Sequence, residues 1–122
     1  MKKKVLGIVL VLFVLGAGSA FAITLGQLMQ NLGQGVRESE GVVNASRNWS
    51  TAEQAQDGWD RLAAQINRAE SAVQDAKRWE AIEGEPLPAN QQRQVNIILA
   101  NLRQIRDKMR AFGIRTDWAI DL

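Results

Sequence analysis

Few residues in this chain could carry acid–base or ion-binding chemistry. The sequence contains no His, no Cys and no Tyr, and without His and Cys the usual ligands of haem, copper and structural zinc are missing. Nucleophilic catalysis that depends on a serine–histidine or cysteine–histidine pair is disfavoured for the same reason. We therefore expect a protein that is not an enzyme and that binds no cofactor and no metal.

Carboxylates remain as groups that could act as acids or as ligands. Glu80 and Glu83 continue, by their spacing, an apolar stripe that reaches Ala76. One interpretation makes them a buried acid pair with raised pKa values, suited to general acid catalysis or to a hard cation. In the other interpretation the stripe shifts to Trp79 and Ile82 and leaves both glutamates in water. We favour the shift, because a helix end that extends past its partner is normally solvated.

Three arginines are candidate contact residues. Arg103, Arg106 and Arg110 are separated by three and four positions, so they share one face of a helix. Such a row could bind the phosphates of lipid head groups or polysaccharide anions. The favoured alternative is a solvated face that interacts with acidic side chains and with the negative end of its own helix dipole.

The C-terminal segment supplies three more candidate contact residues. Trp118, Ile120 and Leu122 give the segment an apolar, any, apolar ending, which is the form that a PDZ groove binds by strand addition. The alternative is that Trp118 and Ile120 pack back onto the helices. We favour packing, because the motif is only three residues long.

Two stripes predict the helices that would position these residues. Pro86 and Pro88 are the only prolines, and they separate the stripes. Ser50 and Glu53 form a capping box that opens the first helix, and Gly113 suits a left-handed cap after the second. The stripes, each with alternating spacings of three and four, are Ala52, Ala55, Trp59, Leu62, Ile66, Ala69, Val73 and Ala76, then Val95, Ile98, Leu102, Ile105, Met109 and Phe112. Helices over about 51–83 and 88–112 follow, joined as an antiparallel hairpin.

The segment over about 24–48 also has apolar residues at helical spacing, but four glycines interrupt it. Each interior glycine costs up to about 1 kcal/mol relative to alanine, so we expect a looser N-terminal helix. The predicted fold is all-α: a small three-helix bundle formed by the hairpin and this helix. Residues 23–122 make one domain with a short tail from 114.

The first 22 residues have the layout of a secretory signal peptide. Lysines at positions 2 to 4 precede an apolar run, Val5 to Leu15, and mostly small residues that end Ala20-Phe21-Ala22. We predict cleavage after Ala22 and a location in the bacterial periplasm or outside the cell; a retained membrane anchor is the alternative. Cleavage removes three of the fifteen basic residues and none of the thirteen acidic ones, so twelve minus thirteen leaves a net charge of −1. Nucleic acid is therefore a disfavoured partner.

These observations predict an exported, non-enzymatic helical protein that acts by protein–protein contact as an adaptor, chaperone-like binder or assembly subunit. Its partner would be an envelope protein or a second copy of itself, with the oligomeric state open and no membrane span left after cleavage. The candidate contact surface comprises the apolar residues outside the main stripes, Val36, Val43, Ile97 and Leu99. The alternatives are a small-molecule or ion binder, or enzyme, that uses inward carboxylates and arginines, and a self-assembling coiled-coil protein.

Overall fold

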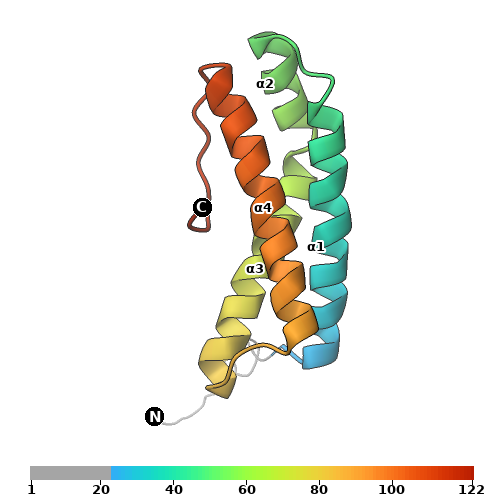
Figure 1. Cartoon of the computed structure of the whole chain (residues 1–122), viewed down its shortest axis with the longest axis vertical. Coiled ribbons are helices and arrows are strands. Elements are labelled where there is room, and N and C mark those ends of the chain that lie inside the picture. The colour runs from blue at the N-terminus through green and yellow to red at the C-terminus, as the bar shows by residue number, and fades with distance from the viewer. Residues whose placement is uncertain (1–22) are drawn as a thin grey trace.

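The computed structural model describes residues 23–122, in which the chain forms four helices. They are α1 (Leu25–Ser46), α2 (Ala52–Arg61), α3 (Ala63–Glu83) and α4 (Ala89–Ala111). Figure 1 shows a bundle in which α1 and α4 run in the same direction and α3 runs against both. The predictions of an all-α bundle and of an antiparallel hairpin are confirmed, whereas the predicted signal peptide at 1–22 lies outside the described residues.

The core lies between α1, α3 and α4. Alanines on α3, together with Ile66 and Val73, face larger aliphatic side chains on α4, as the two stripes predict, and on α1, which the stripes do not predict. The largest fully buried hydrophobic side chains are Leu28, Leu32, Val42, Ile66, Val73, Ile98, Leu102, Ile105 and Met109. Burial of this set from water stabilises the bundle through the hydrophobic effect.

The expectation of a loose N-terminal helix is wrong, because α1 packs extensively against both α3 and α4. One of its glycines makes this close packing possible: a Cβ atom added to Gly35 would lie 2.9 Å from Ile98 Cδ1 and 3.2 Å from Ala72 Cβ. Thr24 and Gln27 form a capping box at its start. The helix is therefore held at its end and along its buried face, and the missing side chain at Gly35 is required for close packing.

The predicted helix over 51–83 is interrupted at Leu62, which has φ −102° and ψ 12°. Helical hydrogen bonding continues across the break, from Leu62 N–H to the Gly58 carbonyl at 2.9 Å and from Ile66 N–H to the Leu62 carbonyl at 3.1 Å. The stripe keeps the same spacing on both sides of Leu62, so nothing in the pattern indicates the interruption. The N-cap is Thr51, one residue after the predicted Ser50.

The ends of the hairpin agree with the sequence to within a residue. Gly84 ends α3 with φ 69°, and Gly113 follows α4 with φ 77°; both conformations favour glycine. Ile114 N–H donates to the Met109 carbonyl at 3.0 Å, the long hydrogen bond of a Schellman cap. Pro88 occupies the N-cap of α4, so the helix begins one residue after the predicted position 88.

Candidate functional site

The C-terminal tail, residues 114–122, folds back along the helices beside α4, where Figure 1 shows it turning down from the end of that helix. The Trp118 ring meets the Trp59 ring of α2 edge to face, with centroids 5.2 Å apart and an interplanar angle of 84°. Ile120 is only 8% exposed and belongs to the core. The predicted packing of Trp118 and Ile120 onto the bundle is confirmed, and Leu122 packs against the same core.

Three side chains hold the main chain of the tail. Ala119 N–H donates to Glu70 Oε2 at 2.7 Å, and Gln74 Nε2 donates to the Ala119 carbonyl at 3.4 Å. Arg106 Nη1 donates to the Leu122 main-chain oxygen at 2.7 Å. Because these side chains come from α3 and α4, the tail bridges the two helices, and its last residues are engaged within the chain instead of being presented to a PDZ groove.

Glu70 is the buried carboxylate of this structure, and sequence reasoning missed it. Its side chain is covered by the tail and the residue is 6% exposed. Burial raises the pKa of this carboxyl above its ordinary value, while the main-chain N–H groups of Ala119 and Ile120 act in the opposite direction. In the sequence, Glu70 directly follows Ala69, a residue of the first apolar stripe. This position gives little indication of burial, because the partner of Glu70 lies forty-nine positions away in the chain.

The three predicted arginines do not act as one surface. Arg103 and Arg110 are exposed. Arg106 is partly buried, and its guanidinium contacts both the Leu122 oxygen and Asp107, with Nε 3.0 Å from Asp107 Oδ1. The middle member of the row therefore holds the tail, and the interpretation as a continuous anion-binding row loses its central residue.

The interpretation of Glu80 and Glu83 as a buried acid pair is wrong. Glu83 is exposed, and Glu80 is partly exposed, with its Oε2 accepting a hydrogen bond from Leu87 N–H at 3.0 Å. The expected shift of the stripe is half right, because Trp79 is buried but Ile82 is 55% exposed. Glu80 thus stabilises the connection between α3 and α4.

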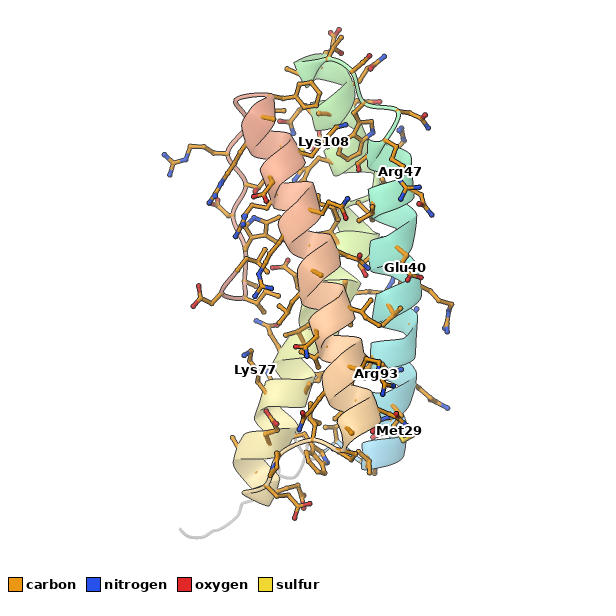
Figure 2. The ribbon with its side chains drawn as sticks, in the orientation of Figure 1. Met29, Glu40, Arg47, Lys77, Arg93 and Lys108 are labelled. Carbon is orange, nitrogen blue, oxygen red and sulfur yellow. The ribbon has the colours of Figure 1, made fainter. Side chains whose placement is uncertain are left out.

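A groove of about 650 Å³ runs between α1 and α4, and we call it the α1–α4 groove. Figure 2 shows two of its residues, Met29 and Arg93, close together at the lower end of these helices. Met29 is 46% exposed, and Gly33 hollows the α1 wall, since it carries no side chain. The lining residues are Met29, Gly33, Val36 and Arg37 from α1 and Asn90, Gln91, Arg93, Gln94 and Ile97 from α4.

This groove combines apolar side chains with two cations. Among the described residues, no carboxylate forms an ion pair with Arg37 or Arg93, and Arg93 donates instead to Asn90 Oδ1 at 3.0 Å. Val36 and Ile97 were both expected at a contact surface, and the structure brings them together here.

The two other residues of that expected surface lie elsewhere. Val43 is buried, and Leu99 packs against the core. Val43 cannot offer a contact surface because it is buried. Val36 and Leu99 are both partly buried against the core, but Val36 lines the α1–α4 groove together with Ile97, and Leu99 does not. Sequence reasoning missed Met29 and the two groove arginines. The two walls of the groove are more than fifty residues apart in the chain, and only the packing of the bundle makes them neighbours.

Two further observations concern what residues 23–122 lack. No helix there has an apolar run long enough to cross a membrane, and that region contains no group of three or more His, Cys, Asp or Glu residues placed to hold a metal ion. No protein-family model, no curated protein and no solved structure matches the chain.

Proposed function

We propose that this protein is exported to the bacterial envelope and acts there, without catalysis, by binding another protein as an adaptor, chaperone-like binder or assembly subunit. The layout of residues 1–22 supports export. The α1–α4 groove carries the rest of the proposal: it places the exposed Met29 and the partly exposed Val36 and Ile97 beside two arginines.

The form of the groove favours a macromolecular partner. It is open to solvent along two helices and is not enclosed as a small-ligand site usually is. An apolar strip with a charged rim is the common composition of a protein interface, and Arg and Met are enriched at such interfaces. Methionine adds a polarisable side chain that adapts its shape to a partner.

The small-molecule alternative has less support from the geometry. Of the acidic residues among 23–122, Glu70 is the buried one, and its carboxylate accepts main-chain N–H groups of the tail. A ligand at this carboxylate would have to displace the tail. The α1–α4 groove is exposed, and a partner could bind there without displacing the tail.

Photo-crosslinking in intact cells tests the proposal. A photoreactive amino acid replaces Met29 in the groove, and a matched control replaces Ile82, an apolar residue of similar exposure on α3. We expect one discrete crosslinked envelope protein from position 29 and none from position 82. In the purified crosslinked product, the chain of this protein should begin at Ile23.

Three results would contradict the proposal. No crosslink from position 29, or equal products from both positions, would remove the groove as a contact site. A product that contains only this chain would support self-assembly instead. A chain recovered from the cytoplasm with residues 1–22 attached would contradict export.

A further inference from the structure

We infer that the α1–α4 groove binds an acidic amphipathic helix of the partner protein. The inference rests on the proposed function and names the chemistry of the partner. Three properties of the groove carry it: the arrangement of its walls, the kind of polar group it offers, and its charge.

The walls of the groove are two helices that lie side by side. Met29, Gly33 and Val36 recur every three or four residues along α1, and Arg93 and Ile97 do so along the neighbouring wall of α4. Two such rows with a hollow between them present the ridges and grooves into which a third helix packs. The partner helix would cover this face and add a fourth long helix beside α1, α3 and α4.

The polar groups of the groove also favour a helix over an extended segment. An extended chain needs acceptors for its main-chain N–H groups, and at the docked tail Glu70 provides one. The α1–α4 groove is lined by no carboxylate, and the side-chain oxygen of Asn90 already accepts from Arg93. Gln94 Oε1 is a buried acceptor without a partner there, but one amide oxygen does not satisfy the successive N–H groups of an extended chain. A helix satisfies its own main chain, so it requires only apolar contact and partners for the cations.

The charge of the groove selects an acidic partner. Arg37 and Arg93 stand one on each wall, and no ion pair neutralises either one among the described residues. Carboxylates on both flanks of a docked helix would form charge-assisted hydrogen bonds with these guanidinium groups. A second copy that docked through the same face would bring like charges together, which disfavours symmetric self-association.

The length of the apolar and basic stretch sets the size of the occupant. From Met29 to Arg37 it spans nine residues of α1, a rise of roughly 12 Å over eight steps of about 1.5 Å. Further along α1 the wall becomes polar and mixed in charge: Figure 2 shows Glu40 and Arg47 there, and both line the next hollow. A helix of two to three turns is therefore enough to fill the α1–α4 groove.

The test uses residues 23–122, the whole of the predicted exported chain, and two designed helical peptides. One peptide has leucine at the a and d positions and glutamate at the flanking positions; the matched peptide has lysine in place of glutamate. Fluorescence anisotropy at low salt should show that the acidic peptide binds roughly tenfold tighter or more. The double variant Arg37→Glu/Arg93→Glu should reverse this preference.

A second double variant, Arg103→Glu/Arg110→Glu, makes the same charge change on exposed residues of α4 outside the groove and should keep the preference for the acidic peptide. All four arginines are exposed, so we expect both variants to keep the fold. Circular dichroism checks this. Equal binding of both peptides, no binding of either at millimolar concentration, or insensitivity to the groove variant would overturn the inference.

Two other occupants would give distinct results. Binding to phosphatidylglycerol vesicles that the groove variant abolishes, without peptide binding, would assign the arginines to lipid and reject a helix. A dimer that depends on Met29 would assign the groove to a second copy. If the crosslink from position 29 persists in the Arg37→Glu/Arg93→Glu variant, protein contact stands as the function and the acidic helix is the wrong partner.

Discussion

Two faces of α4 differ in what covers them. On the side of α3, the tail of the chain closes the surface with Trp118 and Ile120 and is held by Glu70 and Arg106. On the side of α1, Met29 stays exposed. The same helix therefore shows one face completed by its own chain and another that its own described residues leave open.

The two faces also differ in the interactions that their charged side chains make. At the docked tail, the carboxylate of Glu70 and the guanidinium of Arg106 are both used on main-chain groups. In the α1–α4 groove, Arg37 and Arg93 form no ion pair with any described residue. In our proposal, a partner protein covers these arginines and the apolar side chains beside them. The following variants test how far the two faces really differ.

Removing one large apolar side chain from each face should give the largest contrast. Trp118→Ala removes the ring that meets Trp59, and we expect a loss of about 3 kcal/mol in the free energy of unfolding, near the lower end for truncation of a large aromatic. Met29→Ala should change it by less than about 0.5 kcal/mol, as for an ordinary surface substitution. Urea unfolding measures both. Similar losses would show that Met29 is as well packed as the tail.

Two glycines of α1 give a second contrast, between a closed face and the open one. Gly35→Ala should destabilise the protein by about 2 kcal/mol, because the new methyl group collides with Ile98 and Ala72 in a packed interface. A Cβ atom at Gly33 meets its nearest neighbours, Arg37 and Gln94, only at 3.7 and 3.9 Å. Gly33→Ala should therefore stabilise the helix by up to about 1 kcal/mol. Thermal unfolding decides, and a stabilised Gly35→Ala variant would contradict the close approach of the helices.

The hairpin could be predicted because its signals are local. The spacing of Ile98, Leu102 and Ile105 defines a helix and its buried face, and all three are fully buried. Gly113 and the contact between Ile114 and Met109 define the end of that helix. Capping and periodicity depend on residues within one or two turns, so a sequence displays them directly.

The rest depended on contacts between distant segments. Gly35 lowers the stability of an isolated helix, but in the bundle it allows α1 to approach Ile98 and Ala72 closely. Glu70 is buried because residue 119 covers it. The α1–α4 groove is defined by Met29 and Arg93, which lie far apart in the chain. Periodicity identifies the buried face of each helix, but packing decides which of these faces contact one another.

Arginines on the two faces offer a third test. Arg106→Met keeps an apolar stem but removes the donor to the Leu122 oxygen, and we expect a loss of about 1 kcal/mol, the usual scale for one hydrogen bond. Arg93→Met should leave the free energy of unfolding unchanged while it weakens binding of the acidic peptide. Chemical denaturation combined with amide exchange of the tail separates the two effects. Equal destabilisation by both changes would mean that Arg93 also has a structural role.

The smallest expected effect concerns the pH dependence of tail docking. Burial raises the pKa of Glu70 above its ordinary 4.5 when the tail is docked. Below that ordinary value the carboxyl is protonated in both states and docking carries no ionisation penalty. As the pH rises through the raised pKa, the docked state must hold a buried charge, so docking weakens. The ¹⁹F resonance of fluorotryptophan at Trp118 reports docking, and Glu70→Gln should remove the trend while the exposed control Glu83→Gln keeps it.

This pH effect must be measured at the tail, because global stability contains an opposing contribution. The hydrogen bonds from Arg68 lower the pKa of Glu38, across the contact between α1 and α3. A lowered pKa adds stability above the ordinary value of that carboxyl and loses it as the pH falls through the lowered pKa. Global unfolding would therefore mix two opposite trends. If the Trp118 resonance shows docking that strengthens as the pH rises, the N–H groups of Ala119 and Ile120 outweigh burial at Glu70, and the tail is held by a carboxylate that favours its charged form.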